Sequence, residues 1–137
     1  MKVLLDTNVI LDFLLEREPF AIDAKRIIAE IESGNIDGYL SPTSVTTLHY
    51  LIAKARSKKS ADEIVFKILQ LFEISKIDKH ILVEAAQHNG SDFEDSVIYT
   101  SALFSGMDYI ITRDAKGFQN AKVGVLSPAE LVARLSP

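Results

Sequence analysis

The fold is decided near the start of the chain, where residues 2–14 read KVLLDTNVILDFL. Residues 2–5 have the apolar character of a buried strand, and Asp6 follows them directly. A second strand-like stretch, residues 109–112, is followed closely by Asp114. A carboxylate just past an apolar strand lies at the rim of a sheet, where α/β proteins place their ligands. The sequence therefore predicts an α/β fold with an acidic site at the carboxyl ends of its strands.

Further acidic residues precede the second of these strands. Asp92 and Asp95 open the helix that is expected to run into it. Carboxylates that converge in a low-dielectric cleft repel one another, and a hard divalent cation with oxygen ligands relieves that repulsion. The first hypothesis is therefore a metal site for phosphate chemistry.

Length and composition restrict the class of protein. The 137 residues carry a formal net charge of −4 and include no cysteine, so disulfides and thiolate-bound zinc are excluded. This length fits one domain, residues 1–137, and no apolar run reaches the length of a membrane span, so we expect a cytoplasmic protein without a membrane partner. The negative charge argues against binding nucleic acid by bulk electrostatics. It does not exclude a nuclease, because a bound metal ion reverses the local charge.

Strand and helix signals alternate along the chain. Strands are expected at residues 2–5, 37–40, 72–75, 109–112 and 123–126. Helices are expected to begin near residues 8, 19, 42, 60, 78, 92 and 128. Ser60 and Ser127 each open a capping-box pattern, and the helix that Asp78 caps is expected to end at Asn89-Gly90. Alternating strands and helices imply parallel crossovers with helices on both sheet faces, so the prediction is one three-layer α/β domain.

Three blocks of sequence resemble the motifs of the PIN domain family. Residues 6–12 read DTNVILD and are similar to its opening motif, and residues 92–97 read DFEDSV and are similar to its third. Residues 112–114 read TRD, with a phenylalanine four residues after Asp114, and resemble its fourth motif. The three blocks stand in the order of the family and cover essentially the whole chain.

The resemblance implies a five-stranded parallel sheet in the order 3-2-1-4-5. That order places the first and fourth strands side by side, at a topological switch point where a crevice forms. Asp6 and Asp114 would face each other across this crevice, and Asp95 would lean in from the start of its helix.

The resemblance also implies an activity, the metal-dependent hydrolysis of RNA by an endoribonuclease. In such an enzyme Asp6, Asp95 and Asp114 would be the catalytic carboxylates and hold Mg²⁺ or Mn²⁺, and one of them would accept a proton from the attacking water. Small PIN domains of this length are similar to VapC-type toxins of toxin–antitoxin pairs. The implied partners are an RNA substrate, a small antitoxin that covers the crevice, and a second copy of the chain.

Four further residues in these motifs are candidates to support the site. Asn8 either shapes the turn after the first strand or orients Asp6. Asp92 is expected first as the N-cap of its helix and second as an auxiliary metal ligand. Thr112 could hydrogen-bond a carboxylate or a water at the metal, and Arg113 either reaches a phosphate or forms an ion pair with a neighbouring acid.

Two other acids in the motifs are expected to lie in solvent. Asp12 comes six residues after Asp6, more than a turn and a half along the helix. Glu94 is expected to point away from the side of the helix that Asp92 and Asp95 share. The three histidines are not spaced as a metal site, and we assign them no role.

The chain departs from the family pattern on the helix after the second strand. Many members carry a glutamate there, but residues 41–54 read SPTSVTTLHYLIAK and the matching position is Thr47. Ser44, Thr47 and Lys54 share one face of this helix. This face either lines the crevice, where it would offer hydroxyls and the Lys54 cation to a substrate phosphate, or is ordinary polar surface. Because hydroxyls bind a metal weakly, a single firmly held ion, or a second that arrives with the substrate, fits better than a two-metal clamp.

Three alternatives stay open at this point. A catalytically weak PIN domain would only bind RNA or a protein, and the threonine at position 47 motivates this alternative. A magnesium-dependent phosphatase or receiver domain of similar fold is the second, although such phosphatases carry Asp-x-Asp after the first strand and position 8 is asparagine. The third is a subunit of a larger assembly.

Overall fold

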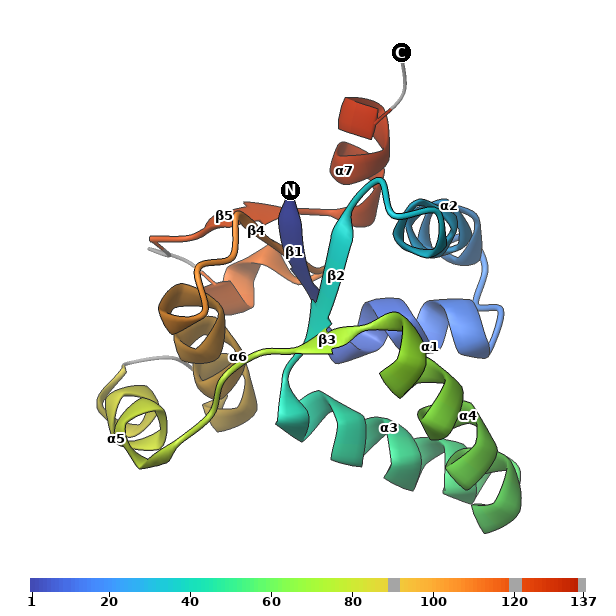
Figure 1. Cartoon of the computed structure of the whole chain (residues 1–137), viewed down its shortest axis with the longest axis horizontal. Helices are drawn as coiled ribbons and strands as arrows, with labels where there is room; N and C mark the ends of the chain where they lie inside the picture. The colour runs from blue at the N-terminus through green and yellow to red at the C-terminus, as the bar shows by residue number, and fades with distance from the viewer. Residues whose placement is uncertain (89–91, 119–121, 136–137) are drawn as a thin grey trace.

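The sheet has the strand order that the resemblance implies (Figure 1). The computed structural model describes residues 1–88, 92–118 and 122–135, and in that part five parallel strands form one sheet in the order β3-β2-β1-β4-β5. The strands are β1 (Lys2–Leu5), β2 (Asp37–Leu40), β3 (Glu73–Ile74), β4 (Tyr109–Ile111) and β5 (Gly124–Leu126). The predicted ranges of β1 and β2 are confirmed, whereas β3, β4 and β5 are each shorter than predicted.

A helix follows every strand of the sheet. The helices are α1 (Thr7–Leu14), α2 (Ala21–Glu32), α3 (Pro42–Ala55), α4 (Lys58–Leu71), α5 (Lys79–Gln87), α6 (Phe93–Phe104) and α7 (Pro128–Leu135), with a short 3-10 helix η1 (Ala115–Phe118) after β4. Ser41, Asp78 and Asp92 cap α3, α5 and α6 by accepting hydrogen bonds from backbone N–H groups. The predicted end of α5 at residues 89–90 lies outside the described residues. Within the described ranges, no helix has both the length and the apolar character needed to cross a bilayer.

The two predicted capping boxes have different outcomes. The prediction that α4 begins with a cap at Ser60 is wrong, because Ser57 is the cap and its Oγ accepts a hydrogen bond from the Ser60 amide at 3.0 Å. Serines three residues apart offer equivalent caps, and the earlier one lengthens the helix by nearly a turn. The box at Ser127 is confirmed, since its Oγ accepts from the Glu130 amide at 3.1 Å and the Glu130 carboxylate accepts from the Ser127 amide at 2.9 Å.

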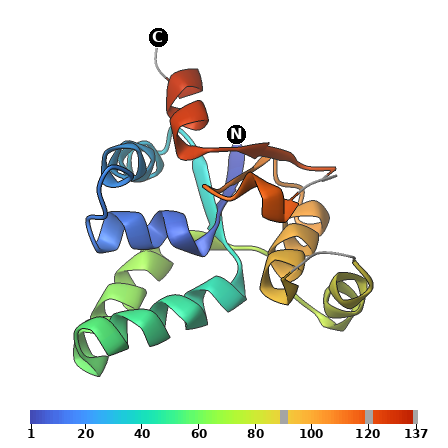
Figure 2. The ribbon, with the colours of Figure 1, turned by 180° about the vertical axis from the view of Figure 1, so that it is seen from behind.

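Alternate residues of β1 face opposite sides of the sheet and so join two separate cores. Val3 and Leu5 pack with residues of α1, α2, α3, α4 and α7, whereas Leu4 packs with Ile98 of α6 on the other face. Figure 2 shows the molecule from behind, with α5 and α6 gathered on one side and α1 to α4 on the other. The predicted three-layer arrangement is therefore confirmed.

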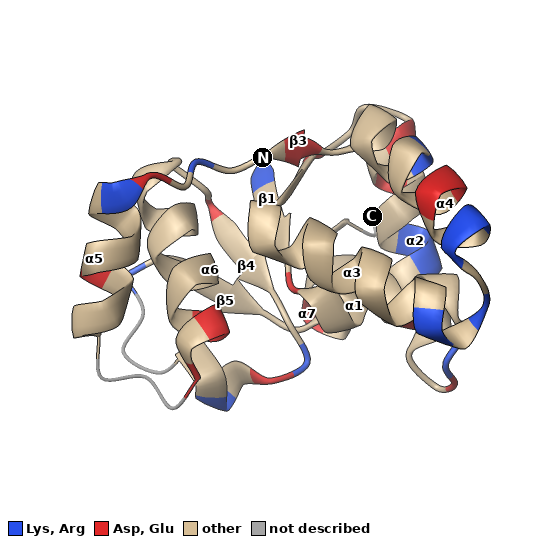
Figure 3. Cartoon of the chain, turned by 90° about the horizontal axis from the view of Figure 1, so that it is seen from below, with Lys and Arg blue, Asp and Glu red and all other residues tan. Residues whose placement is uncertain are grey.

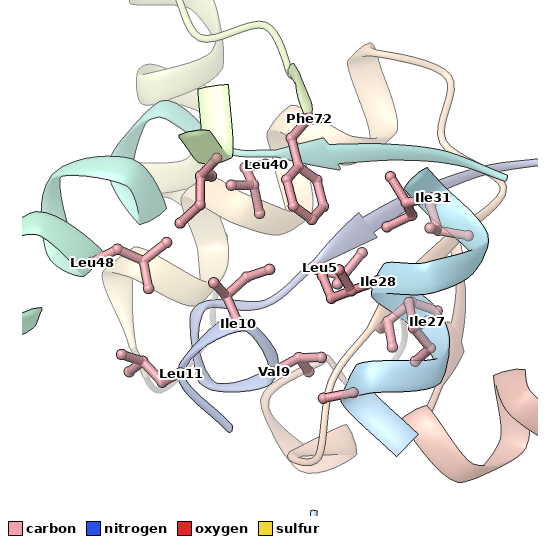
Figure 4. Packing of buried hydrophobic residues seen from close by; sticks show 14 of the residues in the cluster. Leu5, Val9, Ile10, Leu11, Ile27, Ile28, Ile31, Leu40, Leu48 and Phe72 are labelled. Carbon is pink, nitrogen blue, oxygen red and sulfur yellow. The ribbon is translucent and has the colours of Figure 1, made fainter. Parts of the chain in front are cut away.

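The larger core fixes the helices that carry several candidate site residues. Ile10 of α1, Ile27 of α2, Leu40 of β2 and Leu48 of α3 meet in it (Figure 4), and each is at most 1% exposed. Burying one such aliphatic side chain stabilises the fold by roughly 2 kcal/mol. This packing holds α1 and α3 against the sheet, and their first turns consequently lie at its carboxyl edge.

We expect Gly38→Ala in β2 to destabilise the fold, because the added methyl group would overfill the larger core. A Cβ atom there would lie 2.6 Å from Cδ1 of Ile31 and 2.9 Å from the ring of Phe72. Overpacking of this kind costs about 1–3 kcal/mol, which urea unfolding would measure. The double variant with Ile31→Val removes the offending Cδ1 and should recover part of the loss. Equal stability of Gly38→Ala and the unchanged chain would contradict this packing.

Candidate functional site

Asp6 lies where the two central strands end. The register pairs Leu5 of β1 with Ile111 of β4, and the Asp6 amide donates to the Ile111 carbonyl at 2.9 Å. The Asp6 side chain is 7% exposed. Its Oδ1 accepts from the Thr7 amide at 2.8 Å and its Oδ2 accepts from Oγ1 of Thr112 at 2.8 Å. Asp6 is therefore both the N-cap of α1 and a buried carboxylate tied to the end of β4.

The environment of Asp6 opposes its negative charge on balance. Burial raises the pKa of Asp6, and the nearby charge of Asp114 raises it further. The hydrogen bonds from Thr112 and the Thr7 amide, together with the charge of Arg113, lower the pKa but do not cancel the rise. The protein therefore stabilises the ionised form of Asp6 only in part, and a cation beside the carboxylate would stabilise that form further.

Two more carboxylates converge beside a residue without a side chain. A Cβ atom added to Gly117 of η1 would lie 2.8 Å from Oδ2 of Asp95 and 3.5 Å from Oδ2 of Asp114. Asp95 occupies the first turn of α6, which Asp92 caps by accepting from the Asp95 amide at 3.1 Å. Figure 3 shows acidic residues at the start of α6, close to the loop after β4. The bare α-carbon of Gly117 therefore leaves room for the Asp95 carboxylate, which a side chain there would displace.

The surroundings of Asp95 favour its neutral form. Burial, followed by the charges of Asp6, Asp92, Asp114 and Glu94, raises its pKa to about 6. Like charges raise a carboxyl pKa only when they are close and poorly screened. The acids at the end of β1, at the start of α6 and on the loop after β4 thus form one electrostatic group, although they are distant in the sequence.

The chemistry of this group fits a hard divalent cation. Its donors are carboxylate oxygens, the ligand type that such ions prefer. Asn8, two residues after Asp6, has an Oδ1 that is buried without a hydrogen-bond partner, and it is the only such side-chain atom among the described residues. As placed, however, no three acidic or histidine side chains in the described part of the chain are close enough to hold one ion. The predicted acids thus lie near one another, but in this arrangement they do not form a complete set of metal ligands.

The prediction that Asp12 lies in solvent is wrong. Asp12 is 1% exposed, and it accepts from Nε and Nη2 of Arg113 at 2.6 and 3.2 Å. Arg17 is 3.8 Å away, and the Arg113 guanidinium also stacks on the ring of Phe20, 3.9 Å from its centroid. Of the two roles weighed for Arg113, the ion pair is the one observed. This ion pair fixes the loop after β4, in which Thr112 precedes Arg113 and Asp114 follows it.

The prediction that Glu94 lies in solvent is also wrong. Glu94 is half-buried, and its Oε1 accepts from Oγ1 of Thr47 at 2.9 Å. Ser44, one turn earlier on α3, accepts from Oγ1 of Thr7 at 2.9 Å. This face of α3 therefore borders the site rather than solvent. Lys54 is exposed on the last turn of α3, and its assignment to a substrate phosphate stays a prediction.

Of the two missed residues, Asp12 left a signal in the sequence and Glu94 did not. Asp12 interrupts an apolar stretch, residues 9–14, and a charge within a buried helix calls for a partner. The partner of Glu94 lies 47 residues away, and nothing local to α6 announces it.

Comparison with known proteins identifies the family. The model of the PIN domain family matches residues 2–116. The chain is 30% identical over 140 residues to Ribonuclease VapC1 of Aquifex aeolicus (strain VF5), and the alignment covers 97% of this chain and 94% of that protein. The chain therefore belongs to the PIN domain family.

Solved structures show the same fold. A toxin–antitoxin complex from Klebsiella pneumoniae contains a chain with 22% identity and a TM-score of 0.70, covering 92% of this chain and 97% of its own. VapBC-1 from nontypeable Haemophilus influenzae contains one with 19% identity and a TM-score of 0.69, covering 94% and 99%. Because these identities are below 25%, the comparison shows a shared arrangement of strands and helices only.

Asp12→Ala should destabilise the protein by about 3 kcal/mol, because it leaves the partly buried charge of Arg113 without its partner. Urea unfolding would measure the loss. The matched control is Asp62→Ala, which breaks the pairs with Lys58 and His49 in which the Asp62 side chain is 52% exposed and should cost far less. Equal losses in the two variants would show that the Asp12 pair is not buried as described.

Asp95→Asn should stabilise the metal-free protein at neutral pH. The folded-state pKa of about 6 lies above the ordinary value of 3.8, so ionised Asp95 opposes folding. This penalty is absent below about pH 4, grows as the pH rises, and is complete above about pH 6. Because Asp95 is only partly buried, solvent screening reduces it to the order of 1 kcal/mol.

Urea unfolding of both proteins in EDTA, at about pH 4 and about pH 7.5, measures this difference. We expect equal stabilities at the lower pH and a more stable variant at the higher one. A variant that is less stable than the unchanged chain at the higher pH would contradict the charge crowding around Asp95.

Proposed function

We propose that this protein is a metal-dependent endoribonuclease and the toxin of a toxin–antitoxin pair. The observation that carries the proposal is the convergence of Asp6, Asp95 and Asp114 at the switch point between β1 and β4. The 30% identity to a protein named Ribonuclease VapC1, over nearly its whole length, supports the same activity.

The ion in this proposal is Mg²⁺ or Mn²⁺, held by Asp6, Asp95 and Asp114 with support from Asn8. When bound, such an ion polarises a phosphoryl oxygen and lowers the pKa of a water for in-line attack on the phosphodiester. The unpartnered Oδ1 of Asn8 and the raised pKa values of Asp6 and Asp95 favour a cation at this place.

The remaining residues act by holding these carboxylates in place. Thr112 donates to Asp6 and accepts from the Asp114 amide at 3.0 Å, so it joins two of the proposed ligands. The pair between Arg113 and Asp12 fixes the same loop from the other side. A site whose parts are fixed before the substrate binds loses less free energy to reorganisation during the reaction.

The proposed partners are an RNA substrate, a small antitoxin and a second copy of this chain, in the cytoplasm. The similar folds of the Klebsiella pneumoniae and Haemophilus influenzae proteins, which come from complexes named for toxin and antitoxin or VapBC, support the antitoxin. A groove of about 430 Å³ between α1, α2 and α4 adds to that support, since its apolar lining includes Phe13, Leu14, Ile64 and Leu71.

Asp6→Asn should reduce cleavage of unstructured RNA in Mn²⁺ at least about 100-fold, because it removes a carboxylate on which cation binding would depend. Asp37→Asn is the matched control, since Asp37 is exposed at the opposite end of β2, and it should cleave as the unchanged chain does. EDTA should abolish cleavage by all three proteins, and circular dichroism would confirm that each is folded.

Equal residual activity of Asp6→Asn and the unchanged chain would contradict the nuclease. It would favour the alternative of a catalytically weak PIN domain that only binds RNA or a protein.

A further inference from the structure

We infer that one face of α3, together with its turn into α4, is a docking surface for a single strand of RNA. On this surface a base stacks on the ring of Tyr50, and Lys54, Arg56 and Lys59 contact phosphates. The inference rests on the proposed function, because it places part of the substrate beside the cleavage site.

The first turns of α3 lie at the site. Ser44 accepts a hydrogen bond from Oγ1 of Thr7, the first residue of α1, at 2.9 Å. Thr47 donates to Oε1 of Glu94, in the first turn of α6, at 2.9 Å. From there α3 runs outward to its turn into α4 (Figure 1), so its later turns continue the border of the site.

Tyr50 and Lys54 lie on the same face of α3 as Thr47. The three positions have the spacing i, i+3 and i+7, which repeats along one side of an α-helix. Seven residues correspond to roughly 10 Å along the helix axis. A strand that leaves the cleavage site therefore has to extend by only a few nucleotides to reach Lys54.

The ring of Tyr50 is open to a base. Tyr50 is 63% exposed, and it forms no hydrogen bond and no ring contact within residues 1–88, 92–118 and 122–135. Stacking on an aromatic ring suits an unpaired base of any identity, because every base has a flat face. Bases of a duplex already stack on one another, so this contact favours a single strand.

Most of the basic residues at the turn between α3 and α4 are not neutralised by an acid. Lys58 pairs with Asp62 at 2.8 Å. Lys54, Arg56 and Lys59 form no ion pair with any described residue. Arg56 donates to a backbone carbonyl of α1 at 3.3 Å, which orders its side chain and leaves its charge in place. Three positive charges are thus available to an anion.

The charge of this region is opposite to that of the whole chain. Residues 41–61 contain four lysine or arginine residues and no aspartate or glutamate, whereas the chain carries a net charge of −4. A chain with this net charge does not attract RNA by its overall field. Its contacts with phosphates consequently have to come from a local basic region.

The helix dipoles account for only part of this arrangement. Lys54 is in the last turn of α3, where a cation is favourable. Lys58 and Lys59, however, begin α4, and the positive end of the dipole disfavours cations there. Asp62 offsets this repulsion for Lys58. A phosphate bound at Lys59 would offset it for the second lysine.

Fluorescence anisotropy with a labelled, unstructured RNA of about ten nucleotides tests this inference, with EDTA present to stop cleavage. Lys54→Ala/Lys59→Ala should weaken binding about tenfold and reduce the slope of log K against log[salt] by about 1.4, since each phosphate contact of a single strand contributes about 0.7. Lys25→Ala/Lys79→Ala is the matched control. It removes two exposed lysines from α2 and α5, and its binding and salt slope should match those of the unchanged chain.

The stacking role of Tyr50 has its own comparison. Tyr50→Ala should weaken binding of the single strand about tenfold, whereas Tyr50→Phe keeps the ring and should preserve it. A duplex RNA of the same length hides its bases and should bind equally to the two variants. Size-exclusion chromatography of both variants would report any change in the number of associated chains.

The outcomes separate this inference from the proposed function. If the lysine and tyrosine variants bind the single strand as the unchanged chain does, the docking surface is overturned, whatever Asp6→Asn does to cleavage. If they bind weakly while Asp6→Asn cleaves as the unchanged chain does, the docking surface is supported and the proposed nuclease is contradicted. If Tyr50→Ala changes only the elution volume, this face of α3 is an interface between copies of the chain, and the inference is wrong.

Discussion

The hydrogen bond from Thr112 to Asp6 joins the ends of the two central strands, and the rest of the site is arranged around it. It exists because β1 and β4 lie next to each other in the sheet although more than a hundred residues separate them. The same contact buries a carboxylate at the switch point, where crossovers leave in opposite directions and a crevice forms. Burial raises the pKa of Asp6, and the pKa of Asp95 is raised by its own burial and then by the charge of Asp6.

The acids near the carboxyl edge of the sheet have two kinds of surroundings: Asp12 is buried, whereas Asp95 is half-buried and Asp114 is exposed. Asp12 is neutralised by Arg113 within the fold, and this pair pins the loop after β4 to α1. Asp95 and Asp114, beside Gly117, receive no such partner from the described residues. Removing a paired acid leaves the charge of its partner unbalanced and destabilises the scaffold, while unpaired acids that the scaffold holds near one another have the oxygen ligands that a hard metal ion prefers. The separation of these two roles lets one loop serve both structure and chemistry.

Local signals in the sequence predicted most of the fold. The ranges of β1 and β2 are confirmed, and the caps of α3, α5 and α6 lie where polar residues precede apolar periodicity. The strand order came from the resemblance, because no local pattern specifies which strands are neighbours. The errors at Asp12 and Glu94 have the same origin, since their partners are 101 and 47 residues away. Burial and pairing at such separations depend on the packed fold, not on the spacing within a helix.

The most direct test of the account is a crystal structure of the protein soaked in Mn²⁺, with the ion located by its anomalous scattering. We expect a peak at the carboxyl edge of β1 and β4, about 2–2.3 Å from oxygens of Asp6 and of Asp95 or Asp114. A crystal that binds Mn²⁺ only elsewhere on the surface, with these carboxylates accessible and unliganded, would contradict it.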